Sequence, residues 1–309
     1  MERLYRAMHR SEYFHTCRKK VQQCLQNEKQ PENRICIDHQ PTAHHPDRLS
    51  RDNPPKKFGW NRSCRPESCG LVFIGAEHAH QSMFWTSPGY CKVLFNLEPP
   101  GLYPVKDQIH RFIERADFVL TSSSPADFSH PDKVFPFLYG STWIQPGHTM
   151  VHLKSKMISI IASGKTTLVG HKLRHELVQK HRDAFDIYGH GYNPVELKET
   201  ALADYRYSVV IENTQEEYWF TEKIIDAFLT GTIPIYWGGP VASKLFNERG
   251  IKRFSGESDF ARILSECTER YYMENLDAVR ENFELALMFR SPEMVLEEHL
   301  LKQLGLVNE

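Results

Sequence analysis

Three consecutive segments around residue 220 determine the fold that this sequence can form. Residues 207–214 read Tyr-Ser-Val-Val-Ile-Glu-Asn-Thr, residues 219–228 read Trp-Phe-Thr-Glu-Lys-Ile-Ile-Asp-Ala-Phe, and residues 231–238 read Gly-Thr-Ile-Pro-Ile-Tyr-Trp-Gly. The first and last segments contain the apolar runs 207–211 and 233–237, which are bounded by polar residues or glycine, as is typical of strands covered on both faces. The middle segment has Thr221 as an acceptable N-cap and predicts a helix. Strand, helix and strand in this order indicate an α/β unit.

The same alternation continues on both sides of these segments. Apolar runs predict further strands at 71–74, 92–97, 118–121, 157–162 and 185–188, with helices at 105–115, 171–181 and in the tail. The stretch 140–152 is rich in Gly, Pro and Thr and shows no periodicity, so we expect the domain linker there. The sequence therefore predicts three parts: a polar, loosely ordered extension with one short helix (1–61), a first Rossmann-like domain (62–150), and a second with C-terminal helices (151–309).

Composition excludes several classes of protein. The 309 residues contain 38 Lys+Arg and 39 Asp+Glu, and the resulting net charge of -1 makes a nucleic acid an unexpected partner. No apolar run reaches the roughly 20 residues that a membrane-spanning helix needs. The seven cysteines do not resemble a dense disulfide framework, so we expect a reducing compartment, with one or two bridges left open. Cys64, Cys69 and nearby histidines could hold zinc, but their spacing fits no standard zinc pattern.

Polar and charged residues follow the strand at 207–211 directly. Ligands of open α/β sheets bind beyond the carboxyl ends of the strands, and a helix N-terminus presents free N–H groups to anions. Lys223 in the first helical turn opposes the helix dipole, which an anionic ligand would compensate. The pattern thus indicates a phosphate-bearing ligand. The alternative is that Glu222 and Lys223 are the solvated start of an ordinary helix.

These residues resemble the signature of the α-1,3-fucosyltransferase family (glycosyltransferase family 10). The family pattern is a strand ending in Glu-Asn-Ser/Thr, a short loop to Tyr-x-Thr-Glu-Lys, and Gly-x-x-Pro-x-x-x-Gly. Residues 93–100 also resemble the family's Asn-Phe-Glu-Ser-Pro segment, and 170–176 with 186–189 resemble its phosphate-binding helix and Asp-x-Tyr-Gly strand end. The resemblance runs from about residue 71 to the C-terminus. Trp219 departs from it, because the family usually has Tyr there.

The resemblance implies a GT-B fold, in which two Rossmann-like domains face a cleft. The first domain would bind the glycan acceptor and the second the nucleotide-sugar donor, GDP-fucose, with inversion at the anomeric carbon. The resemblance places donor-binding roles on these residues: Arg174 and Lys223 for the pyrophosphate, Glu222 for ribose or sugar hydroxyls, and Asn213 and Trp219 for other donor contacts. Lys172 is a rival to Arg174, and Glu212 is a further candidate for donor binding.

The resemblance implies that Glu98 is the catalytic base, whereas without the resemblance Glu98 would be interpreted as a solvated loop acid. It stands directly after a predicted strand and before Pro99-Pro100, which cannot continue a ladder, so it belongs at the carboxyl edge of the sheet. A carboxylate there can take the proton of an attacking acceptor hydroxyl. We expect no metal cofactor, because the chain lacks the Asp-x-Asp pair with which most GT-A transferases hold a metal-bound diphosphate.

Two other functions stay open from the sequence. The fold could use another nucleotide-sugar, such as a UDP-pentose, or the chain could be a catalytically inactive glycan-binding protein that keeps a GT-B shell. We expect a soluble protein located in the cytoplasm, or in the Golgi lumen if an anchor has been lost or removed. The acceptor glycan and the oligomeric state have no signature in the sequence.

Overall fold

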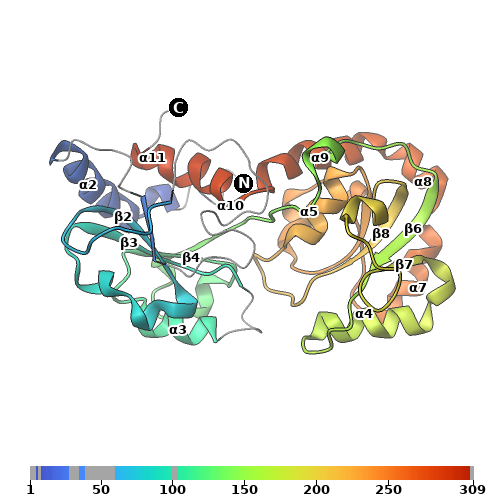
Figure 1. The fold of residues 1–309 in the computed structure, drawn as a ribbon, viewed down its shortest axis with the longest axis horizontal. Helices are drawn as coiled ribbons and strands as arrows, with labels where there is room; N and C mark the ends of the chain where they lie inside the picture. Colours follow the sequence, from blue (N-terminus) through green and yellow to red (C-terminus); the bar gives the residue numbers. More distant parts are fainter. Residues whose placement is uncertain (1–4, 6–7, 28–34, 39–59, 99–103, 307–309) are drawn as a thin grey trace. The chain divides into compact units, whose positions relative to one another are not determined.

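The computed structural model describes residues 5, 8–27, 35–38, 60–98 and 104–306. These residues form two compact units (Figure 1). The first unit contains the described residues up to Leu138 together with those from Pro292 onward, and the second contains Tyr139–Ser291. The division falls before the predicted linker, because residues 139–152 pack with the second unit. The last helices also differ from the predicted domain plan, since the chain returns to the first unit at Pro292.

A parallel five-stranded sheet forms the centre of the first unit. Its strand order is β1-β2-β3-β4-β5, and each neighbouring pair is parallel. The apolar runs predicted the three central strands, whose side chains are fully buried. The strands are β1 (Ile35–Asp38), β2 (Gly70–Gly75), β3 (Tyr90–Phe95), β4 (Phe118–Thr121) and β5 (Val134–Pro136).

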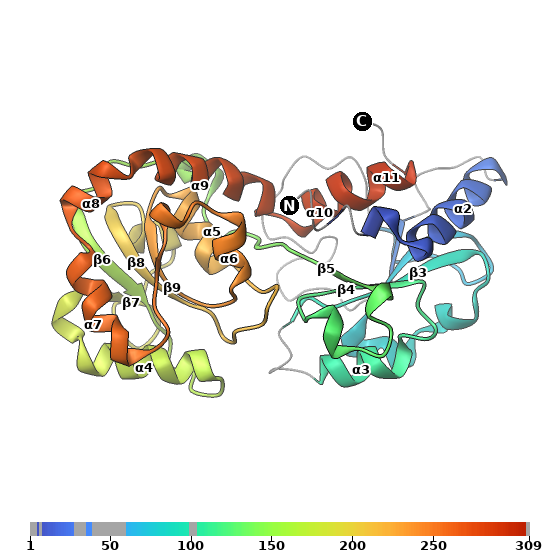
Figure 2. The same cartoon turned by 180° about the vertical axis from the view of Figure 1, so that it is seen from behind.

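Helices cover both faces of this sheet. Helix α2 (Glu12–Asn27) packs on β2 and β3, and α3 (Val105–Phe112) lies on the opposite face (Figures 1 and 2). The C-terminal helices α10 (Pro292–Leu296) and α11 (Lys302–Leu304) are joined by a π-helical turn, and α11 contacts α2.

The described part of residues 1–61 is not a loose extension. Helix α2 and strand β1 are parts of the first unit, and the remainder of the predicted extension lies mostly outside the described residues. A helix does form there, as predicted, but the Lys-, Gln- and His-rich composition did not indicate that one face of it, which includes Phe14, Cys17 and Val21, is buried.

Three disulfides join the first unit, so the expectation of at most one or two bridges is wrong. They are Cys17–Cys91, Cys24–Cys69 and Cys36–Cys64. Cys17 and Cys24 lie on α2, so two of these bridges fasten that helix to the sheet. Cys64 and Cys69, considered above as zinc ligands, are both disulfide-bonded. The seventh cysteine, Cys267, is a buried thiol in the second unit.

The second unit is built on another parallel five-stranded sheet, with strand order β10-β9-β8-β6-β7. The predicted strands all form, and their ends differ by at most two residues from the predicted ones, because the ends of an element are its least defined part. They are β6 (Lys156–Ile161), β7 (Asp186–Tyr188), β8 (Tyr205–Ile211) and β9 (Ile233–Trp237), to which the structure adds the short β10 (Lys252–Arg253).

Helices again cover both faces of the second sheet (Figures 1 and 2). Helix α4 (Val169–Lys180) packs on β8 and on α7 (Glu257–Glu266), while α5 (Glu222–Leu229) packs on β8, β9 and α9 (Leu276–Phe289). The remaining helices are α6 (Val241–Leu245) and α8 (Glu269–Glu274). The arrangement places the first turns of α4 and α5 near the carboxyl end of β8, where ligands of such sheets bind.

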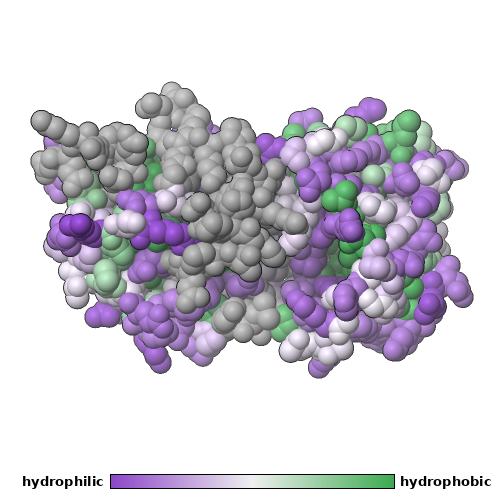
Figure 3. Space-filling view, in the orientation of Figure 1, coloured by the Kyte–Doolittle hydropathy of each residue, from purple (hydrophilic) through white to green (hydrophobic). Residues whose placement is uncertain are grey.

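Apolar surface is scattered on the second unit. On the face drawn in Figure 3 it occurs as small patches among hydrophilic residues. Within the described residues, no helix combines the length and the hydrophobicity required for crossing a membrane.

Candidate active site

A cavity of about 370 Å³ lies within the second unit, at the carboxyl ends of β6 and β8. Its size falls within the range of small-molecule sites. The strand ends contribute Ile161 and Ile211 to the lining, and the helices contribute Arg174, Glu222 and Lys223. The cavity therefore brings together three of the residues to which the sequence gave donor-binding roles.

Arg174 on α4 is anchored to the end of β8. Its Nη2 donates to the carbonyl oxygen of Ile211 at 2.7 Å and to the Oδ1 of Asn213 at 3.2 Å. The residue is 8% exposed, and this burial lowers the pKa of the guanidinium, although an arginine stays charged at neutral pH. A rigidly held, weakly hydrated cation of this kind suits phosphate recognition.

The start of α4 touches the backbone beyond β8. Gly170 N–H donates to the carbonyl oxygen of Asn213 at 3.1 Å, and a Cβ at Gly170 would lie 1.8 Å from the carbonyl oxygen of Glu212. Next to it, His171 is buried, and this burial lowers its pKa. Since its Nδ1 accepts the N–H of Leu168, a neutral His171 carries its proton on Nε2.

Glu212 fixes the start of α5. The carboxylate is fully buried and accepts the N–H of Thr221 at 2.9 Å and its Oγ1 hydroxyl at 2.6 Å. Thr221 is the N-cap that the sequence predicts, because its side chain accepts the N–H of Lys223. The buried acid therefore holds the first turn of the helix that contributes Glu222 and Lys223 to the cavity.

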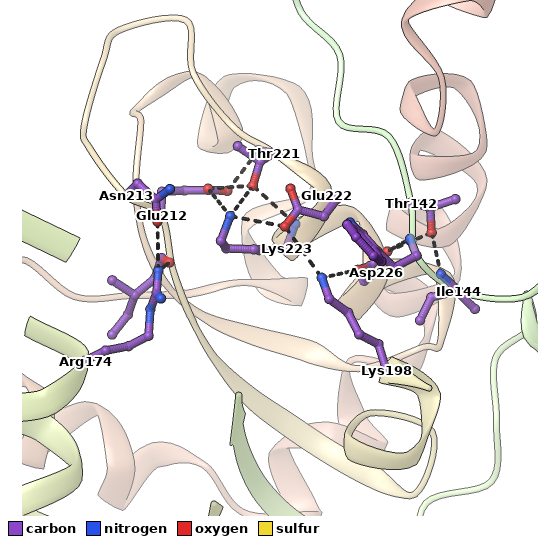
Figure 4. Close-up of polar contacts among 12 residues, drawn as sticks. Thr142, Ile144, Arg174, Lys198, Glu212, Asn213, Thr221, Glu222, Lys223 and Asp226 are labelled. Atoms are coloured by element: carbon purple, nitrogen blue, oxygen red, sulfur yellow. Dashed lines mark hydrogen bonds and ion pairs between the residues drawn. The ribbon is translucent and has the colours of Figure 1, made fainter. Parts of the chain in front are cut away.

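Glu222 lies between two lysines (Figure 4). Its Oε1 is 3.2 Å from the Nζ of Lys223 and 3.5 Å from the Nζ of Lys198. Burial alone would raise its pKa, but Lys223 and Lys198 lower the pKa of Glu222 to about 2, so it is ionised at neutral pH. An ionised carboxylate only accepts hydrogen bonds, which suits the recognition of ribose or sugar hydroxyls.

Lys223 is held by carboxylates of the protein as well as by its place at the cavity. Its Nζ lies 3.6 Å from the Oε2 of Glu212 and 3.0 Å from the Oγ1 of Thr221. The carboxylates of Glu212 and Glu222 compensate the unfavourable position of Lys223 in the first turn of α5, so that position alone does not require an anionic ligand. The side chain of Lys223 remains 24% exposed and lines the cavity. The alternative interpretation, a solvated start of an ordinary helix, did not predict this position.

The other predicted donor residues do not line the cavity. Lys172, the rival to Arg174, is exposed on α4 and is not among the residues that line the cavity. Asn213 holds Arg174, and Glu212 is buried beneath Thr221. Trp219 is 5% exposed, and its indole Nε1 has no hydrogen-bond partner in the described part of the chain.

Glu98, the predicted base, belongs to the first unit. It is exposed and follows β3, as the sequence predicts, and its carbonyl oxygen accepts the side-chain amide of Asn96 at 3.0 Å. The acid Glu77 of the preceding strand connection accepts the N–H of Leu97 at 3.4 Å. Glu98 thus lies at the carboxyl edge of the first sheet, and its catalytic role stays a prediction.

Sequence reasoning missed Lys198 and Asp226, which both line the cavity. Asp226 follows Glu222 by one helical turn, so the i, i+4 spacing could have indicated that both carboxylates share a face. Lys198 comes from a short 3-10 turn (Lys198–Ala201) that carries no motif. Among the described residues, no group of three or more His, Cys, Asp or Glu side chains could hold a metal ion.

Comparison with known proteins shows that the chain is similar to α-1,3-fucosyltransferases. No family model matches the chain. The α-(1,3)-fucosyltransferase FucT of Helicobacter pylori is 39% identical over 98 residues, which are 30% of this chain and 20% of that protein. The chain thus matches only about a fifth of the length of this curated relative.

The fold has a solved counterpart. A crystal structure of an α1,3-fucosyltransferase with GDP superposes with a TM-score of 0.50 at 18% sequence identity, covering 80% of this chain and 82% of that one. The two α/β units with parallel sheets agree with the predicted GT-B fold. Over 98 residues of its sequence and in its fold, the chain is similar to α-1,3-fucosyltransferases, the family that its motifs resemble.

Proposed function

We propose that the protein is an inverting glycosyltransferase that transfers L-fucose from GDP-fucose to a hydroxyl of a glycan acceptor. The observation that carries this proposal is the cavity of the second unit, where Arg174 and Lys223 accompany the carboxylate of Glu222. The names of the relatives support the choice of sugar and nucleotide, since one is an α-(1,3)-fucosyltransferase and another is an α1,3-fucosyltransferase with GDP.

Arg174 and Lys223 would bind the diphosphate of the donor. When the bond between the anomeric carbon and the diphosphate oxygen breaks, negative charge accumulates on the leaving GDP. Cations that are already fixed in place stabilise that charge without reorganisation, and such electrostatic stabilisation is usually the largest single contribution to catalysis. Arg174 is fixed by Ile211 and Asn213, and Lys223 by Glu212.

Glu98 would serve as the general base. The acceptor oxygen attacks the anomeric carbon on the face opposite the leaving group, its proton passes to the Glu98 carboxylate, and GDP departs with the bonding electron pair. One displacement of this kind inverts the anomeric configuration. Glu98 is exposed, and a carboxylate within hydrogen-bond reach of the hydroxyl is a common acceptor of such a proton.

The fixed cations lead us to propose that the reaction needs no metal. We expect the rate of GDP release from GDP-fucose in the presence of acceptor to be unchanged by an excess of EDTA. Loss of activity in EDTA, with recovery on addition of Mg²⁺ or Mn²⁺, would contradict this.

Incubation of the purified protein with GDP-fucose and a panel of N-acetyllactosamine-type glycans tests the function itself. The proposal predicts GDP release that depends on an acceptor, and a fucosylated product. A thermal-shift comparison of GDP, UDP and their sugars separates the donors, because a cognate ligand stabilises the fold by mass action. Stabilisation by UDP-sugars alone would contradict the proposed donor.

The disulfides bear on where the protein works. Three bridges in one unit are unusual for a cytosolic protein, because thiols there are kept reduced. Of the two locations that the sequence left open, they favour an oxidising lumen over the cytoplasm.

A further inference from the structure

The cavity contains a lysine that the sequence motifs do not include. Lys198 precedes β8 in the chain and reaches toward α5 from a different segment (Figure 4). Its Nζ lies 2.8 Å from the Oδ2 of Asp226 and 3.5 Å from the Oε1 of Glu222. The same ammonium therefore touches two carboxylates that lie one helical turn apart.

Asp226 anchors this lysine. It is 1% exposed, and its other oxygen accepts the Oγ1 hydroxyl of Thr142 at 2.7 Å and the N–H of Trp143 at 2.9 Å. Lys198 also lies over the Trp143 ring, with its Nζ 5.5 Å from the ring centroid. Because Asp226 is held by two donors from the 142–143 segment, it fixes the position of the Lys198 ammonium.

The charges around Glu222 alternate along a chain of five residues. Glu212 and Asp226 stand at its ends, are 0% and 1% exposed, and each is bound by neutral donors. The three members between them are Lys223, Glu222 and Lys198, at 24%, 22% and 23% exposed, and all three line the cavity. The two ends are thus buried and held by the protein, although Asp226 also borders the cavity, and the three middle side chains are exposed enough to meet a ligand.

We propose that Lys198 is a positioning residue for the donor site, which holds the Glu222 carboxylate ionised and aimed at the hydroxyls of the nucleotide-sugar. The inference rests on the proposed function. Lys198 acts through Glu222, and Asp226 serves as its anchor. Two lysines that flank one carboxylate restrict its rotation more than one lysine can, because Lys223 contacts it from α5 and Lys198 from the 3-10 turn before β8.

The electrostatics agree with this role. The charged groups that act on Glu222 are the cations Lys223, Lys198 and Arg174 and the anion Asp226, while Glu212 pairs with Lys223. Burial and the nearby Asp226 charge both raise the pKa of Glu222, and the lysines lower it. Removal of Lys198 takes away one of the lowering charges, so the pKa of Glu222 rises. Because only the ionised form accepts hydrogen bonds at both oxygens, donor binding then weakens as the pH falls.

The test is the dissociation constant of GDP-fucose, measured by calorimetry on the full chain from about pH 8 to about pH 5. GDP-fucose is suitable because its diphosphate is esterified at both ends and does not titrate in this range. Lys198→Gln is the main variant, since it keeps a donor for Asp226 and removes the charge. Lys198→Arg restores the charge, and Lys244→Gln removes a charge from an exposed lysine of α6.

We expect wild type, Lys198→Arg and Lys244→Gln to change affinity by less than about two-fold across this range, whereas Lys198→Gln weakens several-fold toward its acidic end. Unfolding midpoints confirm that each variant is folded, and Lys198→Met replaces Lys198→Gln if the latter is not. A Lys198→Gln constant that follows the wild type at every pH overturns this inference alone. A wild type that does not bind GDP-fucose overturns the proposed function, and this inference with it.

Discussion

Lys223 is the residue whose charge the proposed reaction uses most directly. We expect Lys223→Ala to lower kcat/KM for GDP-fucose by roughly 100-fold, because one fixed cation no longer stabilises the leaving diphosphate. Acceptor-dependent GDP release measures this effect. Lys244→Ala is the matched control, since that lysine is 63% exposed and makes only a 3.8 Å ion pair with Glu217. Equal rates in Lys223→Ala and wild type would refute the assignment.

Substitution of Glu98 should affect the chemical step without affecting donor binding. We expect Glu98→Gln to lower kcat by about 100-fold or more, because an amide cannot take the acceptor proton. The dissociation constant for GDP should not change, since the cations proposed to bind it belong to the second unit. Initial rates and calorimetry test the two statements separately. A variant that loses GDP affinity while its kcat is preserved would assign Glu98 to binding instead.

The site residues divide according to how local their sequence signal is. Glu222 and Lys223 stand in a motif at a helix start, and Arg174 stands in the predicted helix, so pattern and resemblance lead to them. Lys198 acts through a contact between segments 28 residues apart, and such a contact leaves no spacing pattern. Trp219 is the opposite case: it belongs to the motif, but it is buried and is not among the residues that line the cavity.

At the scale of single elements, Gly170 determines how closely α4 approaches β8. Alanine there is preferred in a helix, but its Cβ would collide with the carbonyl of Glu212. We expect Gly170→Ala to destabilise the protein by about 1–3 kcal/mol, the usual cost of overpacking, and to weaken GDP binding because Arg174 lies on the same helix. Chemical denaturation and calorimetry measure both effects.

Gly164→Ala is the control for this substitution. It lies in the loop before the same helix, and its Cβ would meet no atom within 4 Å. Gly170→Ala and Gly164→Ala should therefore differ in stability, and equal stabilities would show that the contact between α4 and the β8 end is looser than described.

Long apolar runs made the central strands of both sheets predictable. Strand β9 begins and ends at the predicted residues, because Gly and polar residues delimit the run on both sides. The short edge strands β5 and β10 escaped prediction, since runs of two or three residues carry no periodicity. Strand β1 was missed for a similar reason, as four residues within a polar region do not stand out.

At the scale of the whole molecule, the two units differ in their covalent cross-links. All three bridges lie in the first unit, and the cavity lies in the second. Reduction should destabilise the first unit by about 2–4 kcal/mol per bridge, because its unfolded state gains entropy. Differential scanning calorimetry with and without a reductant should show one transition moving to lower temperature and the other, which GDP stabilises, unmoved. If both transitions moved together, the units would unfold as one.

The way in which the chain divides into two units could not be predicted from the sequence. Polar composition indicated an extension, but cross-links between α2 and the sheet depend on which cysteines meet in space. The return of the chain to the first unit at Pro292 likewise follows from packing of α11 on α2, which no local signal announces.

The central claim is that Arg174 and Lys223 form a diphosphate site in the cavity of the second unit. Calorimetric titration of GDP into the wild type, Arg174→Ala and Lys223→Ala tests it most directly. Saturable binding to the wild type that weakens by about ten-fold or more in each variant is the predicted result. No binding to the folded wild type, or equal affinity in all three proteins, would contradict the claim.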